Sequence, residues 1–267
     1  MMEISTLQPQ GTPVGDVIRS EADAQTILRV ENLTVSFDGF RAVDSLSLSV
    51  ERNELRVVIG PNGAGKTTLL DMICGKTRPS SGHVFFNEVD LTKLSEHQIV
   101  RAGVGRKFQT PSVYEDLTVV ENFEISLPEG QDVLGSLFFR RNEEVMHRIE
   151  TVADQVFLRE LLDQKAGRLS HGQKQWLEIG MLLIQSPQLL LLDEPVAGMS
   201  PRERELTADL LSNVSRGKSV IVIEHDMDFV KRIAHKVTVL HQGRVLSEGS
   251  AAEVQVDPRV IDVYLGH

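Results

Sequence analysis

Apolar residues alternate with polar ones in two stretches near the start of the chain, residues 27–37 and 46–50. Such alternation predicts strands with one buried face. Residues 55–59 and 189–192 are continuous apolar runs, which are typical of strands covered on both faces. Between these runs, helical spacing dominates residues 96–173. The same patterns predict a helix over residues 65–74, a strand over 84–86, a helix over 201–212, a strand over 219–224 and a hairpin over 237–246.

The order of these elements predicts an α/β fold interrupted by a helical insertion, with mixed strands first and parallel strands later. We expect an α/β core from residues 26–95 and 176–267, and a helical subdomain from about 96 to 175. Residues 1–25 are polar and contain Gly and Pro, so we expect a flexible tail. Residues 127–139 are expected to form a loop whose apolar side chains serve either local packing or contact with a partner.

Composition narrows the class of protein. The net charge of −10 disfavours nucleic acid as a partner, because an acidic chain repels phosphate backbones. The chain has one cysteine, so no disulfide can form within it, which suits a reducing cytosol. No apolar run approaches the ~18–20 residues of a spanning helix, and the first residues lack the apolar core of a secretion signal. We therefore expect a cytosolic protein that meets a membrane only through a partner.

One segment matches the phosphate-binding loop, G-x-x-x-x-G-K-[ST], between a predicted strand and a predicted helix. Its glycines let backbone N–H groups approach phosphate oxygens, and the following helix adds its positive end. Lys66 would bind the β- and γ-phosphates, and the Thr67 hydroxyl would ligate Mg²⁺. The predicted nucleotide-binding residues here are Gly60, Pro61, Asn62, Gly63, Ala64, Gly65, Lys66, Thr67 and Thr68.

The apolar run at residues 189–192 ends in two carboxylates, Asp193 and Glu194. In a P-loop sheet this strand would deliver both beside the phosphate loop. Asp193 would then hold Mg²⁺, directly or through water. Glu194 would act as general base toward the attacking water, a role typically worth about 10²–10⁴-fold in rate.

A third segment, Leu169-Ser170-His171-Gly172-Gln173, resembles the LSGGQ signature of the ABC ATPase family. The resemblance covers the chain from about residue 27 to its C-terminus. It implies an ABC-type P-loop fold whose mixed core carries an antiparallel β subdomain and the helical subdomain. It also implies that Ser170, Gly172 and Gln173 grip the γ-phosphate of ATP held by the opposite subunit of a dimer, as free N–H groups at a helix start allow. His171 departs from the family's usual glycine.

The resemblance extends to single positions. It implies that Gln109 contacts Mg²⁺ and water, and that His225 contacts the γ-phosphate. It places Phe37 against the adenine ring, with Phe40 as the alternative. The segment 195–200 matches the family's D-loop, but Ser200 stands where most relatives have Asp, which leaves communication between the two ATP sites open.

Several stretches, among them LSHGQKQWLEIGMLL and DPRVIDVYLG, resemble ATP-binding subunits of importers for branched-chain amino acids and amides, most of all the urea type. This implies a bacterial ATPase at the cytoplasmic face of the inner membrane, with ATP and Mg²⁺ as cofactors. Its implied partners are a second ATPase copy or paralogue, two membrane-spanning permease subunits and, indirectly, a periplasmic binding protein. Branched-chain amino acid import remains the alternative. A soluble scaffold ATPase of ABC type and a P-loop kinase are rivals from other classes.

Overall fold

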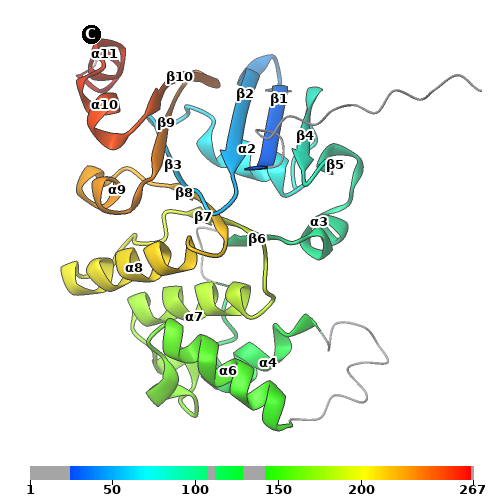
Figure 1. Ribbon diagram of the computed structural model, residues 1–267, viewed down its shortest axis with the longest axis vertical. Helices are drawn as coiled ribbons and strands as arrows, with labels where there is room; N and C mark the ends of the chain where they lie inside the picture. The colour runs from blue at the N-terminus through cyan, green and yellow to red at the C-terminus, as the bar shows by residue number, and fades with distance from the viewer. Residues whose placement is uncertain (1–24, 108–111, 129–141, 266–267) are drawn as a thin grey trace, which may run out of the picture.

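The computed structural model describes residues 25–107, 112–128 and 142–265. In this part of the chain the strands form two sheets (Figure 1). The smaller sheet is antiparallel and has the order β2-β1-β4-β5. Its strands are β1 (Thr26–Phe37), β2 (Phe40–Glu51), β4 (Ser81–Phe86) and β5 (Val89–Asp90). This sheet confirms the expected antiparallel part of a mixed fold.

The larger sheet has the order β10-β9-β3-β8-β7-β6. Its strands run parallel, except that β10 pairs antiparallel with β9 through the hairpin predicted at Gln242-Gly243. The bounds are β3 (Leu55–Ile59), β6 (Val104–Lys107), β7 (Leu189–Asp193), β8 (Ser219–Ile223), β9 (Lys236–His241) and β10 (Arg244–Gly249). The carboxyl ends of β3, β7 and β8 therefore meet at one edge of the sheet.

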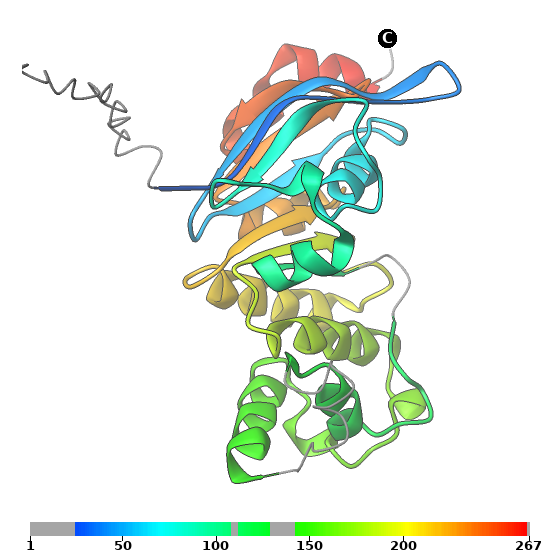
Figure 2. The same cartoon turned by 90° about the vertical axis from the view of Figure 1, so that its right-hand side faces the viewer.

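Helices cover this sheet. The helices between residues 119 and 183 form the lower part of the molecule, here called the lower lobe (Figures 1 and 2). None of the helices in the described ranges has the length and apolar character needed to cross a bilayer. The α-helices are α2 (Lys66–Ile73), α3 (Glu96–Ala102), α4 (Val119–Ile125), α6 (Glu143–Gln155), α7 (His171–Leu183), α8 (Pro201–Val214), α9 (Met227–Ile233), α10 (Ala251–Val256) and α11 (Pro258–Leu265), with 3₁₀ turns at Leu91–Lys93, Arg159–Leu161 and Ala166–Arg168.

Side-chain alternation along the buried strands produces two cores. In β7, Leu190 and Leu192 face the cluster formed with the helices of the lower lobe, while Leu189 and Leu191 face the cluster formed with α2 and the smaller sheet. The residues of β8 alternate in the same way. Because both faces are covered, these strands carry continuous apolar runs, which is why the sequence revealed them.

One core strand lies within the range that the sequence analysis assigned to helices. β6 pairs parallel with β7 at the edge of the large sheet, although two of its four residues are Arg106 and Lys107. Both side chains are almost fully buried, where Arg106 pairs with Asp71 and Lys107 pairs with Glu178. The two cations removed the apolar pattern from this short strand, and their acidic partners offset the cost of burying them.

Two other expectations cannot be placed. All of the predicted tail except Gln25, and most of residues 127–139, lie outside the described residues. Leu127 is described and buried in the core that contains the lower-lobe helices. The division into an α/β core and a helical subdomain stays a proposal, with β6 as a reason to begin the helical part after residue 107.

Replacing Lys107 by Met should destabilise the fold strongly. The Lys107 Nζ lies 3.4 Å from a carboxylate oxygen of Glu178, and the two side chains are 0% and 7% exposed. Removing one partner leaves the other charge buried, which costs about 3–5 kcal/mol. Urea unfolding should show this loss. Lys93→Met is the matched control, because the Lys93 side chain is 75% exposed and its pair with Asp90 should contribute less than about 1 kcal/mol. Equal effects of the two substitutions would contradict the prediction.

Candidate nucleotide site

The phosphate loop joins β3 to α2, as the motif predicts. Gly65 caps α2 with a φ of 97°, and a Cβ atom there would lie 2.4 Å from the Ala42 carbonyl oxygen. Only glycine fits such a position. Gly63 has a φ of 79°, but a Cβ atom there would meet nothing within 4 Å. The loop is thus tightly packed below Gly65 and open at Gly63, which leaves room for a ligand on that side.

The Lys66 side chain folds back onto this loop. Its Nζ donates hydrogen bonds to the carbonyl oxygens of Gly60 at 2.7 Å and Pro61 at 3.0 Å. Burial lowers the pKa of Lys66, while the negative charges of Glu194 and Asp193 act in the opposite direction. A desolvated ammonium held by two neutral acceptors is well placed to bind an anion more strongly than it could in water.

A cavity of about 240 Å³ opens above the loop. The predicted loop residues from Asn62 to Thr68 line it together with Glu194, whereas Gly60 and Pro61 do not, so the fold brings most of the phosphate loop and the expected general base to one place. Its lining residues are Phe40, Ala42, Asn62, Gly63, Ala64, Gly65, Lys66, Thr67, Thr68, Glu194 and Ile223.

Asp193 and Thr67 provide the donor set for a divalent cation. The Asp193 side chain is 2% exposed, and its Oδ1 is buried without a hydrogen-bond partner among the described residues. Burial raises the pKa of Asp193, and a hydrogen bond from Thr67 opposes this shift. An orphaned carboxylate oxygen beside a hydroxyl oxygen fits Mg²⁺, which prefers a few protein oxygens completed by water and phosphate.

Glu194 follows β7 directly and turns its carboxylate toward the cavity. Its backbone φ is 46°, an unusual value for a residue with a side chain. The Glu194 N–H donates to the Ile223 carbonyl at the end of β8, at 3.0 Å. Next to β8, the His225 Nδ1 lies 3.6 Å from Glu194 Oε1. The ends of two adjacent strands therefore bring together the predicted base and the predicted γ-phosphate ligand, as parallel pairing requires.

Sequence reasoning missed Glu224, which holds these two loops together. Its side chain is buried, and burial raises its pKa. It accepts hydrogen bonds from the backbone N–H groups of His225 at 3.2 Å and Val196 at 3.5 Å. The sequence did contain a signal for Glu224, because a carboxylate there ends the apolar run of residues 220–223. Its partner Val196 follows Glu194, and only the folded chain shows that contact.

Ser170, Gly172 and Gln173 do not line the cavity that contains Lys66. Ser170 instead caps α7, with the Gln173 side chain completing a capping box. His171, which replaces the usual glycine, contacts the D-loop segment through its Nε2, 3.1 Å from the Ala197 carbonyl oxygen. The signature residues thus begin a helix, as expected, but they lie away from the cavity that contains Lys66.

The remaining predicted site residues divide into two cases. Gln109 lies outside the described residues, so its role stays a prediction. Phe37 and Phe40 pair across the β1–β2 hairpin, and both are about half exposed or more. Phe40 lines the cavity and Phe37 does not, so the geometry favours the alternative aromatic as the surface nearest the loop.

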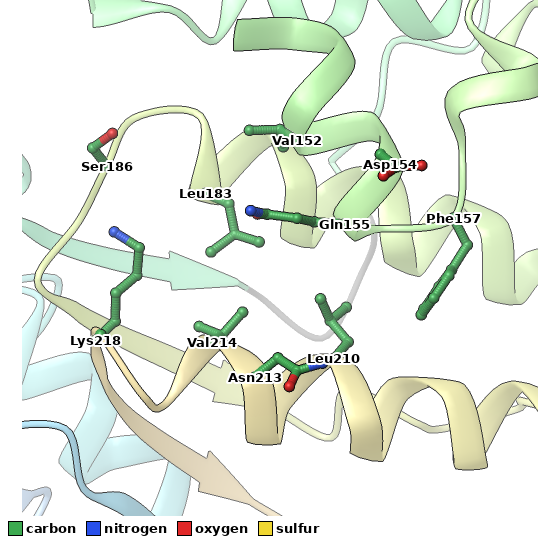
Figure 3. A pocket seen from close by; sticks show the side chains of 11 residues that line it. Val152, Asp154, Gln155, Phe157, Leu183, Ser186, Leu210, Asn213, Val214 and Lys218 are labelled. Atoms are coloured by element: carbon green, nitrogen blue, oxygen red, sulfur yellow. The ribbon is translucent and has the colours of Figure 1, made fainter.

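A larger cavity of about 560 Å³ lies elsewhere, where α6, α7 and α8 end (Figure 3). It shares no residue with the phosphate-loop cavity. Its charged residues include Asp154 and Lys218, and the Lys218 Nζ donates to the Pro187 carbonyl oxygen at 2.9 Å. Size therefore does not indicate the nucleotide site, whereas the glycine loop, Lys66 and Glu194 around the smaller cavity favour that cavity.

Comparison with known proteins agrees with this site. The ABC transporter family model matches residues 43–197, more than half of the chain. A model described as "Branched-chain amino acid ATP-binding cassette transporter" matches residues 244–267. An ATP-binding cassette of an ABC transporter, solved in its ADP conformation, superposes with a TM-score of 0.80 and 33% identity, covering 91% of this chain and 99% of that one. A nucleotide-free cassette superposes with a TM-score of 0.78, also at 33% identity, over 91% and 100% of the two chains.

Two curated relatives narrow the branch. The probable branched-chain amino acid transport ATP-binding protein LivG of Methanocaldococcus jannaschii is 34% identical over 91% of this chain and 99% of its own. The high-affinity branched-chain amino acid transport ATP-binding protein BraF of Pseudomonas aeruginosa is 36% identical over the same shares. Neither name mentions urea, so the expected urea-type likeness is not supported. The chain belongs to the ABC transporter family, as an ATP-binding subunit of the branched-chain amino acid importer type.

Proposed function

We propose that two ATPase subunits, this chain and a second copy or a paralogue, enclose ATP between them and couple its hydrolysis to import. One observation supports this above all. The phosphate loop and the signature helix are complete within the chain, yet Ser170 and Gly172 take no part in the cavity around Lys66. Each half-site lacks what the other has, so a facing partner would complete both.

In the closed dimer, Lys66 binds the β- and γ-phosphates. Thr67 and Asp193 would hold Mg²⁺, which would neutralise charge that develops on the phosphates. Glu194 orients and deprotonates the attacking water, and His225 contacts the γ-phosphate. Gln109 is proposed to contact Mg²⁺ and water. Ser170, Gly172 and Gln173 of the facing subunit supply the last anion donors. Catalysis then rests on positioning and electrostatic stabilisation rather than on a covalent intermediate.

The partners proposed are two membrane-spanning permease subunits, with a periplasmic binding protein acting through them. The chain would lie at the cytoplasmic face of the membrane, docked on the permeases. LivG and BraF are named for branched-chain amino acids, which makes this substrate class the best supported, ahead of urea or short amides. Their names also favour a transporter over a soluble scaffold ATPase. In this proposal the permease and the binding protein select the cargo.

Replacing Ser170 by Ala should abolish ATP turnover although Lys66 and Glu194 are intact, because the signature of each chain would serve the partner's ATP. A Glu194→Gln chain should also be silent. Mixing the two variants should restore activity, since each heterodimer contains one intact site. If chains mix freely and sites act independently, recovery approaches about a quarter of the wild-type rate. The readout is phosphate release as a function of mixing ratio.

Two outcomes would contradict an ATP site shared between two chains, which we call the composite site. The first is wild-type turnover by the Ser170→Ala chain alone, which a single-chain kinase would show. The second is no recovery in a mixture whose heterodimers are verified by tagged pull-down.

A further inference from the structure

Two helix N-termini meet at the carboxylate of Glu203. Ser200 caps α8, and Glu203 Oε2 accepts from its backbone N–H at 2.8 Å and from its hydroxyl at 2.7 Å. Ser170 caps α7, and its hydroxyl donates to Glu203 Oε1 at 3.3 Å. The two helices lie side by side in both views of the molecule (Figures 1 and 2). A residue that belongs to the α8 cap thus also covers the start of the signature helix.

The same carboxylate packs against Gly172. A Cβ atom built on Gly172 would lie 2.3 Å from Glu203 Oε1, so any larger residue would collide with it. Glu203 therefore contacts both Ser170 and Gly172, two of the residues proposed to grip a γ-phosphate. Hydrogen bonds from Ser200, then from Ser170, and the nearby His171 lower the pKa of Glu203. The side chain carries a full negative charge at neutral pH.

This contact uses the donor that a phosphate would need. The Ser170 hydroxyl oxygen accepts from the Gln173 N–H at 3.2 Å, and its single proton goes to Glu203. A hydroxyl has only one proton to donate. A γ-phosphate oxygen bound there would have to take that proton, and it would face the Glu203 charge at close range. Like charges a few ångströms apart disfavour each other.

We propose that Glu203 is the resident anion of the signature site. In the free chain its carboxylate accepts the hydroxyl proton of Ser170 and covers Gly172. On dimer closure, the γ-phosphate of ATP on the facing subunit displaces it. ADP has no γ-phosphate and leaves Glu203 in place. Glu203 thereby raises the ATP concentration that closure requires and keeps the ADP form open. This inference rests on the proposed composite site.

Glu203→Gln tests the charge while keeping the cap, because Gln serves equally well at this position of a capping box. The substitution is made in full-length Glu194→Gln protein, so that hydrolysis does not deplete the closed state. The ATP concentration for half-maximal dimerisation, followed by sedimentation velocity, should fall roughly 3- to 10-fold. ADP affinity measured by calorimetry should stay unchanged, since Glu203 does not line the phosphate-loop cavity.

Glu253→Gln, in the same background, is the matched control. Ser250 and Glu253 form the same capping box at α10, with the Ser250 N–H and hydroxyl 2.7 Å and 2.9 Å from Glu253 Oε2. Both substitutions should change thermal stability alike, but only Glu203→Gln should lower the ATP threshold. An unchanged or higher threshold in Glu203→Gln would overturn the inference. Absence of any ATP-dependent dimer in the Glu194→Gln parent would instead overturn the composite site.

Discussion

Replacing Glu194 by Gln should slow ATP hydrolysis by about 10²–10⁴-fold without loss of nucleotide binding. Gln retains the shape of the side chain but cannot accept the proton of the attacking water. Lys66 would still bind the phosphates, and one negative charge at the cavity is removed. Nucleotide should therefore be retained longer than in the wild-type protein, with the dimer closed around it.

Phosphate release under steady state and the nucleotide retained after gel filtration measure the two effects together. Glu205→Gln provides the control, because this exposed carboxylate on α8 pairs with Arg202 and lies outside the cavity. It should hydrolyse ATP at the wild-type rate. Normal turnover in the Glu194→Gln protein would remove Glu194 from the role of general base.

Replacing Lys66 by Ala should weaken ATP binding by roughly 100-fold or more, because two charge-assisted hydrogen bonds of about 1.5–3 kcal/mol each are lost. In the free chain the ammonium donates to two loop carbonyls, of Gly60 and Pro61. ATP would draw the same group onto its phosphates. No other lysine lines this cavity, so nothing in its described lining can replace the charge.

Calorimetric titration with Mg-ATP gives the affinity directly. Lys76→Ala is the matched control, since Lys76 lies shortly after α2 and its Nζ is 3.7 Å from Asp71. It should bind ATP with wild-type affinity. An affinity in Lys66→Ala equal to that of the control would contradict the assignment of the phosphate loop.

Contiguous motifs gave reliable predictions of local structure in this chain, because their residues act on neighbours in the sequence. The loop from Gly60 to Thr67 folds between β3 and α2 as its glycines require, and Ser170 caps the helix that follows it. Residues 189–192 were recognised as a covered strand because both faces are apolar. Residues of this kind were enough to predict the fold class and the position of the phosphate loop.

Tertiary structure decided the contacts between residues far apart in the chain. β6 pairs with β7 inside the core although it carries two cations, because Asp71 and Glu178 neutralise them, and no local pattern encodes such pairs. Glu203 meets Ser170 only because α7 and α8 pack together. The position of the β1–β2 hairpin relative to the loop also decided that Phe40, and not Phe37, lines the cavity. Local spacing thus determined which groups this protein carries, whereas packing determined which of them meet.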